Sequence, residues 1–264
     1  MHERHRVKKV LGYTLFTMAH PLDLRRLEEL GLNSSAPPGQ LLYDGWLLRL
    51  LPGQAKRARS VNAIYPSRLA LPDKIAHCAH LYQTHGLPLI FRITPFSEPA
   101  DLDGTLAQMG LPRFDITAVE TAVIDRPRRG PVSTESLALE DWVQVVGGLR
   151  DSPEQFRIAH LKRLQASPLP CRALVLRDGG DVLATGLVIV EDGWAGLFDI
   201  VTATAARRRG FGRRMVDGLL QAASELGAHQ AYLQVDADNL PARRLYAHYG
   251  FTERYRYWYR GHSD

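Results

Sequence analysis

The stretch Arg207-Arg208-Arg209-Gly210-Phe211-Gly212 carries the strongest structural signal in this chain, because it joins an apolar run to an amphipathic helix. The apolar run, Gly196–Val201, has the composition of a buried strand. After the loop, apolar residues recur at helical spacing until Gly227, which is suited to end a helix: Met215, Val216, Leu219, Leu220, Ala223 and Leu226. The predicted order is therefore strand, glycine loop, helix.

This loop has the chemistry of a phosphate-binding site. The first turn of a helix has N–H groups without intrahelical partners and a partial positive charge, and glycines let an anion approach the backbone. Arginines are unfavourable at that end of a helix, and a bound polyphosphate would relieve their repulsion. Five of them surround it: Arg207, Arg208, Arg209, Arg213 and Arg214.

Other interpretations of the loop are a solvated basic turn or a different nucleotide motif. The spacing excludes a Rossmann fingerprint, because Met215 stands where a third glycine or alanine is needed. No Gly-Lys-Ser/Thr follows to form a Walker loop. The choice between a phosphate site and a solvated turn depends on the next segment.

That segment predicts strand, helix, strand. Ala231–Val235 is typical of a buried strand, Asn239 of a helix cap, and Gly250 of a helix end. In the closing strand, alternation places aromatic residues on one face and arginines on the other: Tyr255, Tyr257 and Tyr259 against Arg254 and Arg256.

Together these features closely resemble the GNAT acyltransferase family over residues 195–260. The family's phosphate loop runs Arg/Gln-x-x-Gly-x-Gly/Ala, which Arg207, Gly210 and Gly212 match. Its second signature, an Asn followed by Ala, Leu-Tyr and Gly-Phe, is matched by Asn239, Ala242, Leu245-Tyr246 and Gly250-Phe251. The resemblance implies that acetyl-coenzyme A binds in the splay between the two central strands, with its pyrophosphate on the loop amides.

The resemblance also assigns residues. It implies that Tyr246 is the general acid, since a Tyr hydroxyl with an ordinary pKa near 10 remains a donor at neutral pH. It implies that the backbone N–H of Val201 polarises the carbonyl, and that Asn239 contacts the cofactor as well as capping its helix; capping alone is the alternative. The implied cofactor-binding residues are Ile200, Val201, Arg207, Arg208, Arg209, Gly210, Phe211, Gly212, Arg213, Asn239, Ala242 and Tyr246.

Asp199 is the predicted general base. Strand alternation would place it on one face with Leu197 and Val201, and a carboxylate on so apolar a strand would have a raised pKa. A solvated Asp at an edge is the alternative. The place where some GNAT proteins carry a catalytic Glu falls at Ala195, so that base is absent. Weaker candidates are Glu191, Asp236, His248, Tyr257 and a water-relayed base.

The predicted function is an acetyl-coenzyme A-dependent N-acetyltransferase, with direct attack by a primary amine. The alternatives are a non-catalytic coenzyme A-binding sensor or interaction module, and a nucleic-acid binder that uses the basic loop. No motif identifies the acceptor, a small molecule or a peptide. Trp46, Arg49 and Arg57 are candidates for an acidic acceptor's site, although core packing for Trp46 and solvated faces for the two arginines are the favoured interpretation.

Composition agrees with an enzyme that needs neither nucleic acid nor a membrane. The 264 residues are 45% hydrophobic and allow one large or two small domains. The net charge of +5 is explained by an anionic cofactor. Cys78 and Cys171 predict neither a disulfide framework nor a metal cluster, and a reducing cytoplasm fits them. The apolar run at Val10–Phe16 is too short for a signal peptide, and no run is long enough to span a bilayer.

The cluster Arg126–Pro131 predicts a boundary between residues 1–126 and 127–264. In the second half, the pattern predicts helices at 137–149 and 153–164. Strands at 173–177, 182–190 and 194–201 follow, up to the arginine loop. This order matches the GNAT architecture across residues 130–264.

The first half repeats the plan without its chemistry. It predicts a helix at 22–30, strands at 46–51 and 61–65, a helix ending at Gly86, a strand at 89–93 and a helix ending at Gly110. Gly86 and Gly110 are 24 residues apart, and Gly227 and Gly250 are 23 apart, which suggests duplication. Counting back from these ends places Pro66, Leu69, Leu71 and Leu106 where the second half has Arg207, Gly210, Gly212 and Tyr246.

The predicted fold class is therefore α/β (α+β), with two GNAT-like domains, each a mixed and mostly antiparallel sheet flanked by helices. Residues 1–126 would form a degenerate domain that packs against the catalytic domain, 127–264, and walls its acceptor pocket. An N-terminal extension of another fold is the alternative. The oligomeric state is open, with a homodimer among the alternatives.

Overall fold

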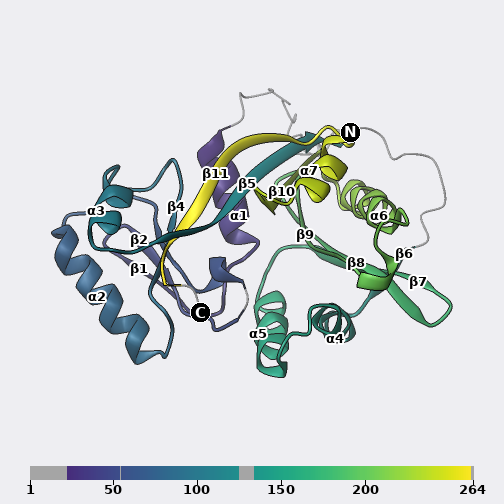
Figure 1. Ribbon diagram of the computed structural model, residues 1–264. Helices are drawn as coiled ribbons and strands as arrows, with labels where there is room; N and C mark the ends of the chain where they lie inside the picture. Colours follow the sequence, from purple (N-terminus) through teal and green to yellow (C-terminus); the bar gives the residue numbers. More distant parts are fainter. Residues whose placement is uncertain (1–22, 54, 125–133, 263–264) are drawn as a thin grey trace, which may run out of the picture.

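The computed structural model describes residues 23–53, 55–124 and 134–262. The Val10–Phe16 run and the predicted boundary at Arg126–Pro131 lie outside them. The described strands form one continuous eleven-stranded sheet in the order β1-β2-β3-β4-β11-β5-β10-β9-β8-β7-β6 (Figure 1). The predicted class, a mixed and mostly antiparallel sheet flanked by helices in each half, is confirmed, and the sheets of the two halves join into one.

The elements of the first half are α1 (Leu24–Asn33), β1 (Gln40–Tyr43), β2 (Trp46–Arg49), the short 3-10 helix η1 (Lys56–Ala58), β3 (Val61–Ala63), α2 (Leu71–Thr84), β4 (Ile90–Ile93), α3 (Leu102–Gln108) and β5 (Arg113–Val123). Those of the second half are β6 (Thr134–Leu137), α4 (Leu139–Leu149), α5 (Glu154–Gln165), β7 (Cys171–Asp178), β8 (Asp181–Glu191), β9 (Trp194–Thr202), η2 (Thr204–Ala206), α6 (Phe211–Glu225), β10 (Gln230–Asp236), α7 (Leu240–Ala247) and β11 (Thr252–Gly261).

The strands near the centre of the sheet follow the same sequence of pairings in the two halves. A parallel pair, β9 with β10 or β3 with β4, is followed by the last strand of the opposite half. Thus β5 of the first half pairs antiparallel with β10, and β11 of the second half pairs antiparallel with β4. In Figure 1 β5 and β11 run side by side between the two lobes. The halves are therefore related by an approximate two-fold, and they exchange their last strands.

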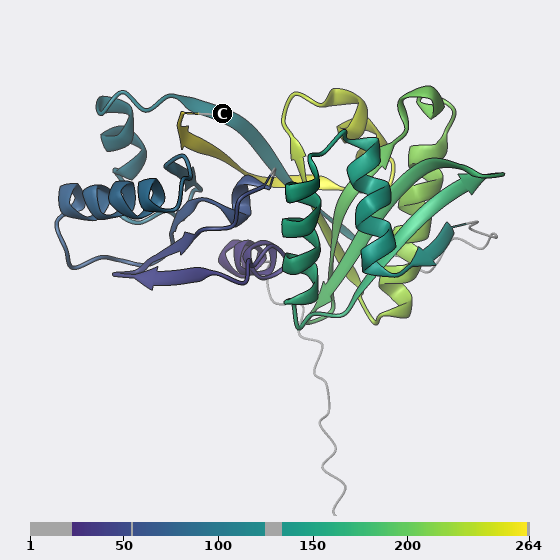
Figure 2. The same cartoon turned by 90° about the horizontal axis from the view of Figure 1, so that it is seen from below.

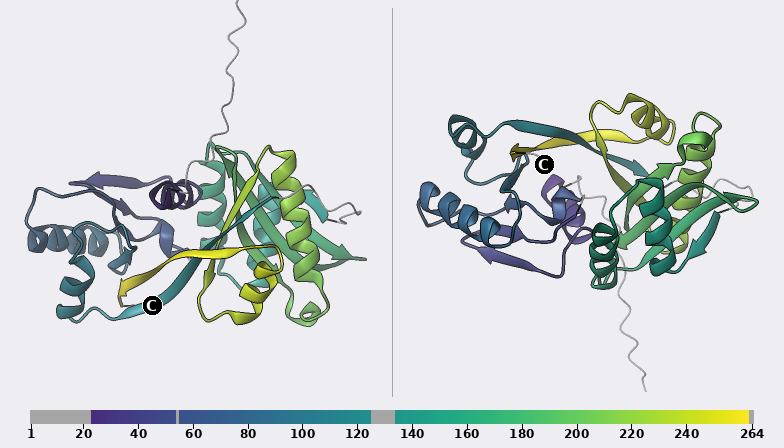
Figure 3. Two further views of the ribbon diagram at one scale, coloured as in Figure 1. Left: turned by 90° about the horizontal axis from the view of Figure 1, so that it is seen from above. Right: turned by 60° about the horizontal axis from the view of Figure 1, so that its bottom comes forward.

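Helices cover the sheet of the second half on both faces. One face packs against α6 and α7, whose Met215, Leu219 and Tyr246 are buried with strand residues such as Leu197 and Val235. The opposite face packs against α4, α5 and also α1 of the first half. Figures 2 and 3 show α1 beside α5, where the two lobes meet. A third core, around Trp46, Tyr82 and Phe91, lies under α2 and α3.

Three strands, β1, β5 and β6, were not predicted from the sequence. The omission of β5 has a clear physical reason, because its buried part includes Glu120 and Thr121, 3% and 2% exposed. Glu120 accepts a hydrogen bond from Arg243 Nε at 2.8 Å, and Thr121 Oγ1 accepts one from Arg254 Nε at 2.7 Å. Polar residues paired in this way interrupt the apolar pattern that identifies a buried strand.

Candidate functional site

The two central strands of the second half separate towards their carboxyl ends. β9 and β10 pair in parallel from Trp194 with Gln230 to Leu197 with Leu233, and no further. Beyond that point β9 continues to pair with β8 only, and β10 with β5 only. The separation places unpaired strand edges from both sides around the same space, which is the splay that the resemblance implied.

A cavity of 330 Å³ occupies this separation. Its walls include Leu197–Ile200 of β9 and Leu233–Asp236 of β10. Tyr246, Asn239 and Ala242 line it from the α7 side of the sheet, and Arg150, His160 and Arg163 from the α4–α5 side. Residues of the first half, including Ser34, Ser35 and Arg57, complete it. The cavity thus connects the two faces of the sheet at the place where the strands part.

The arginine loop has the geometry of an anion site at the start of α6. Gly210 precedes the helix with φ of +84°, a conformation that favours glycine, and a Cβ built there would meet no atom within 4 Å. The first turn of α6 carries no acidic residue. Within the described residues, Arg207, Arg208 and Arg209 form no ion pair with a carboxylate, and all three are exposed. An open backbone, a helix N-terminus and uncompensated positive charge fit the diphosphate of coenzyme A.

The other predicted cofactor residues lie around this loop. Gly212 is in the first turn of α6, and a Cβ on it would lie 3.4 Å from Leu245 of α7 and from Thr202 of β9. Phe211 is buried, with Arg209 5.1 Å from its ring centroid. Arg213 contacts His248. Ile200 packs against the core beneath α6 and lines the cavity, whereas Val201 is not among the lining residues.

Tyr246 and Asn239 are brought together by α7. The Asn239 side chain accepts a hydrogen bond from the Ala242 N–H at 3.2 Å, so the predicted helix cap is confirmed. Tyr246 is 8% exposed and packs edge-on against Phe251. Burial, with the negative charge of Glu120, raises the pKa of Tyr246 to about 12. Its hydroxyl therefore stays protonated at neutral pH and can donate.

The raised pKa predicted for Asp199 is wrong. Its carboxylate lies 2.5 Å from Arg150 Nη1 and 3.4 Å from His160 Nε2. Burial opposes ionisation, but Arg150, His160 and Arg163 together lower the pKa of Asp199 well below its usual range. At neutral pH Asp199 is therefore a carboxylate engaged with cations, and its affinity for a proton is too low for a general base.

The shared face predicted for Leu197, Asp199 and Val201 is also wrong, because β9 contains a bulge. Phe198 pairs with Leu187 and Val201 with Thr185, so β9 has one more residue than β8 between these pairs. Asp199 lies in this bulge with φ of +50°. As a result Leu197 belongs to the core beneath α6, whereas Val201 packs against the core beneath α4 and α5. An extra residue of this kind cannot be read from period-two alternation.

The weaker candidates for the base are dispersed. Asp236 lines the cavity. Glu191 pairs with Arg26 at 2.9 Å and accepts a hydrogen bond from Asn33. His248 contacts Arg213 in the arginine loop, and Tyr257 is buried in the core beneath α4 and α5. None of the last three lines the cavity.

The three residues considered for an acidic acceptor have different roles. Trp46 is fully buried in the core of the first half, as the favoured interpretation held. Solvated faces for the arginines are wrong, because Arg49 is 1% exposed and Arg57 lines the cavity. Arg49 Nη2 donates to Leu32 O at 2.7 Å, and its Nη1 donates to Ser35 Oγ at 3.1 Å. It therefore holds the segment after α1 against β2.

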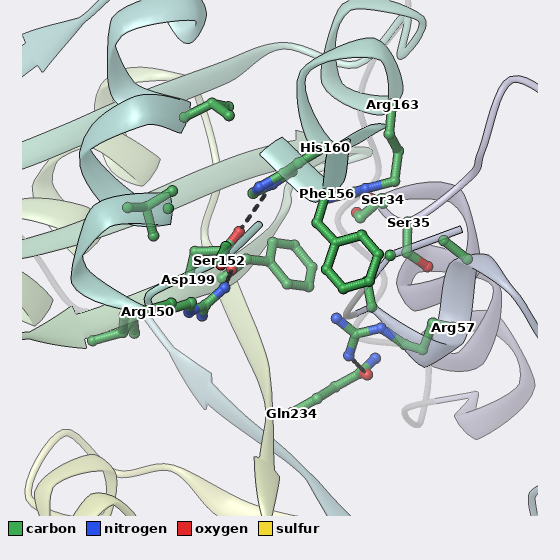
Figure 4. Close-up of a pocket in the computed structure, with 18 of the residues that line it drawn as sticks. Ser34, Ser35, Arg57, Arg150, Ser152, Phe156, His160, Arg163, Asp199 and Gln234 are labelled. Carbon is green, nitrogen blue, oxygen red and sulfur yellow. Dashed lines mark hydrogen bonds and ion pairs between the residues drawn. The ribbon is translucent and has the colours of Figure 1, made fainter. Parts of the chain in front are cut away.

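Sequence reasoning missed the cluster formed by Arg150, His160 and Arg163. All three line the cavity from the α4–α5 segment, and Figure 4 shows His160 directed at Asp199. They lie 36 to 49 residues before Asp199 in the chain, in or next to helices whose pattern indicated only packing. The available signal was weak. It consisted of His160 and Arg163 among the apolar positions of α5 and of Arg150 at the end of α4.

The chain is similar to known acetyltransferases. The sequence model of the family described as "Acetyltransferase (GNAT) family" matches residues 137–251 of this chain. The chain is 31% identical over 252 residues to the Bacillus subtilis (strain 168) protein called Uncharacterized N-acetyltransferase YobR, covering 90% of this chain and 98% of that protein. The chain therefore belongs to the GNAT family of N-acetyltransferases and is an acetyl-transferring enzyme.

Solved structures show the same fold. A GCN5-related N-acetyltransferase from Kribbella flavida superposes with a TM-score of 0.63 at 15% identity, over 91% of this chain and 95% of that one. A GCN5-related N-acetyltransferase from Sphaerobacter thermophilus superposes with a TM-score of 0.53 at 15% identity, over 84% and 82%. The similarity spans both halves, so the arrangement with two lobes is common to these proteins.

No helix in the described residues is both long and apolar enough to cross a membrane. In that same part of the chain, His, Cys, Asp and Glu do not form a group of three or more that could hold a metal ion.

Proposed function

We propose that this enzyme transfers the acetyl group of acetyl-coenzyme A to a primary amine by direct attack of the amine. The observation that carries the proposal is the cavity in the β9–β10 separation, which has Tyr246 and Asn239 at one end and a basic cluster at the other. The cavity is continuous from Tyr246, on the side where the cofactor would bind, to the basic cluster on the other side. Such a space suits a reaction in which two substrates meet at the β9–β10 separation.

The arginine loop and α7 would hold the cofactor. The N–H groups of Phe211, Gly212 and Arg213 lie in the first turn of α6, behind Gly210 and the exposed arginines 207–209. Asn239 and Ala242 line the cavity next to Tyr246. When bound, acetyl-coenzyme A supplies an acetyl thioester, and the chain itself has to orient the amine and handle two protons.

Tyr246 is the proposed general acid. A hydroxyl whose pKa is about 12 is protonated throughout the physiological range. A departing thiolate, with an ordinary pKa near 8.5, accepts a hydrogen bond or the proton from such a group at the end of the reaction. Because Tyr246 is buried at the cavity wall, this proton is delivered away from bulk water.

His160 is the proposed base, with Asp199 in a positioning role. The Asp199 carboxylate lies 3.4 Å from His160 Nε2, and Arg150 holds the carboxylate from the other side (Figure 4). An anionic Asp favours the tautomer with the proton on Nε2, which leaves Nδ1 as the acceptor for a proton from the amine. His160 also packs edge-on against Trp142, which restricts its ring.

The experiment that tests the proposal is Tyr246→Phe in the full chain. We expect kcat to fall about 100-fold, the usual effect of losing a general acid, with the coenzyme A affinity unchanged by calorimetry. The matched control is Tyr82→Phe, which removes a buried hydroxyl that donates to Arg49 O at 2.9 Å and lies outside the cavity. That variant should lose about 1 kcal/mol of stability and keep its kcat.

Two outcomes would count against the proposal. Full turnover by Tyr246→Phe would remove the tyrosine from the chemistry. Tight binding of coenzyme A by the unaltered protein, with no acetylation of any amine offered, would instead indicate a coenzyme A sensor.

A further inference from the structure

The cavity is lined by two arginines that form no direct ion pair with a carboxylate of the described residues. Arg163, 8% exposed, donates from Nη1 to the backbone carbonyl of Ser34 at 3.1 Å. Arg57 donates to Gln234 Oε1, and its Nε is buried without a hydrogen-bond partner. Among the described residues neither forms an ion pair with a carboxylate. Both side chains line the cavity from opposite halves of the chain (Figure 4).

Arginines in buried surroundings elsewhere are satisfied in two ways. Arg92 pairs with Glu28 and Arg243 with Glu120. Arg49, 1% exposed, forms no ion pair with a carboxylate among the described residues, but Leu32 O, Ser35 Oγ and Gln40 Oε1 accept from its donors, and it does not line the cavity. A guanidinium that loses its water without gaining an anion is destabilising in general. Arg57 and Arg163 differ from Arg49 because both line the cavity next to the proposed reaction site, where a ligand can reach them.

Local electrostatics give the same result for Arg163 only, because the pKa of Arg57 is raised by Tyr257 and Tyr259 against the effect of its burial. Burial, together with the positive charge of Arg57, lowers the pKa of Arg163 to about 10, although Asp199 acts in the opposite direction. A lowered pKa means that the protonated form is disfavoured where it lies. A negatively charged ligand at this place would stabilise both guanidinium groups.

We infer that the acceptor carries an anionic group, a carboxylate or a phosphate, beside its amine, and that Arg57 and Arg163 bind this group. The inference rests on the proposed function. A guanidinium presents parallel N–H donors that match the oxygens of a carboxylate or phosphate. The same positive charge repels acceptors that carry only amines, such as polyamines, so the arginines select as well as bind.

The placement of the two arginines also orients the acceptor. Arg57 donates to Gln234, which follows the last residue of β10 paired with β9. Arg163 lies one turn along α5 from His160. An anion held by both arginines leaves the amine of a small acceptor on the side of His160 and the β9–β10 gap. The first half of the chain thereby supplies one of the two residues that decide which amines are used.

The test compares amines that differ only in charge. Acetylation by the full-length enzyme with acetyl-coenzyme A is followed by thiol release. One arm pairs α-amino acids with their amides, and a second pairs O-phosphoethanolamine with ethanolamine. We expect kcat/KM to be about 10- to 100-fold higher for the anionic member of at least one pair, the effect of hydrogen bonds to a charged group. The pair that responds identifies the anion as carboxylate or phosphate.

Variants connect that preference to the two arginines. Arg163→Gln and Arg57→Gln should raise KM for the preferred anionic amine about 10-fold or more, and change KM for its neutral partner less than twofold. The control is Arg172→Gln, a half-buried arginine on β7 that pairs with Glu225 away from the cavity. It should leave both values unchanged. Arg163→Lys keeps the charge without the paired donors and should give an intermediate KM.

The outcomes are distinct. A neutral amine acetylated as well as its anionic partner would overturn the inference and leave the proposed function intact. A preference for anionic amines that persists in both arginine variants would also overturn it. Coenzyme A binding without acetylation of any amine would remove the proposed function, and the inference with it. If a variant does not fold, the comparison of paired amines in the unaltered enzyme still decides.

Discussion

The two halves of this protein have the same order of elements, yet a large cavity is present in one of them at the end of the parallel pair. The separation of β9 and β10 encloses 330 Å³. The corresponding ends of β3 and β4 are next to a hollow of 50 Å³, which the Arg92 and Glu28 side chains line as an ion pair. Topology alone therefore does not make the site, because the side chains at the strand ends decide how much space remains there.

The N-termini of the equivalent helices α6 and α2 also differ, because only that of α6 suits an anion. Before α6 stands Gly210 with φ of +84°, and the first turn of the helix has no acid. Before α2 stands Ala70 in an extended conformation, and Pro72 and Asp73 occupy its first turn. Proline removes an N–H donor and aspartate repels an anion, so this helix end does not suit phosphate.

This comparison corrects one detail of the sequence analysis. Counting from the helix ends placed Leu69 and Leu71 opposite the two glycines, but α2 is 14 residues long and α6 is 15. Aligned on their first residues, Ala70 and Pro72 take those positions. The conclusion that the first half lacks the glycines is unaffected.

The largest expected effect comes from separating the halves. Because β5 lies between β10 and β11, and β11 pairs with β4, neither half has a complete sheet of its own. We expect fragments 1–128 and 129–264 to be unfolded when expressed singly, by near-ultraviolet circular dichroism, and to form a soluble one-to-one complex when expressed together. A folded, monomeric fragment 129–264 that binds coenzyme A would contradict this prediction.

The second prediction compares one ion pair from each half. Glu28→Gln leaves the buried Arg92 unpaired and should cost about 3 kcal/mol in the free energy of unfolding. Asp199→Asn leaves unpaired Arg150, which is exposed, and should cost less. We expect Glu28→Gln to keep kcat, because Glu28 lies outside the cavity, and Asp199→Asn to lower kcat and shift its pH profile. Equal kcat values for the two variants would remove Asp199 from the mechanism.

The stability difference at Asp199 should depend on pH with a definite sign. Its pKa is lowered on folding by Arg150, His160 and Arg163, against the effect of burial. The stabilisation is therefore fully present above the ordinary pKa of an aspartate, near 3.9, and is lost as the pH falls below it. The free energies of unfolding of the unaltered protein and of Asp199→Asn, measured with denaturant, should differ by a constant amount from about pH 8 to pH 5. The two values should converge as the pH falls below about 4. Divergence towards low pH would contradict the assignment.

The third comparison is between the helix starts. Gly210→Val places a β-branched residue at a φ of +84° and should weaken coenzyme A binding about 10- to 100-fold by calorimetry, because the strained loop no longer presents its amides. The matched control is Ala70→Val, at an exposed and extended position before α2, which should leave the affinity unchanged. An equal loss in the two variants would show that the arginine loop is not the cofactor site.

The smallest expected effect is that of a single exposed arginine. Arg207→Ala should weaken coenzyme A binding about 3- to 10-fold at low salt, and less as the salt concentration rises, because exposed charges are screened. Arg68→Ala, an exposed arginine shortly before α2, is the control and should have no effect. Salt-independent weakening by Arg207→Ala would indicate a structural role.

Local patterns predicted the elements that a few neighbouring residues define. Gly86, Gly110, Gly227 and Gly250 all have positive φ at the ends of their helices, as their positions suggested. Asn239 caps α7, and the tyrosines of β11 are buried while Arg254 and Arg256 are exposed. These outcomes depend on backbone conformation and on alternation within one element, and both are encoded locally.

Other features depended on residues distant in the chain. The central strand β5 escaped recognition because Glu120 is satisfied by Arg243, 123 residues away. Asp199 received the wrong pKa because Arg150 and His160 come from other elements, and the bulge that directs it is defined by pairing with β8. Arg57 and Arg163 meet in one cavity although the sequence separates them by more than a hundred residues.

The sequence by itself determined the family, the glycine conformation of the candidate phosphate loop, the candidate acid Tyr246 and the repeated order of elements, because each of these is encoded in short-range spacing. Tertiary structure alone decided the exchange of β5 and β11, the ionised state of Asp199 and the placement of Arg57 and Arg163 in one cavity without a direct ion pair. The physical reason is that hydrogen-bond satisfaction, burial and electrostatic compensation depend on which groups come within a few ångströms of one another. Packing of the whole chain, rather than any one segment, sets those distances.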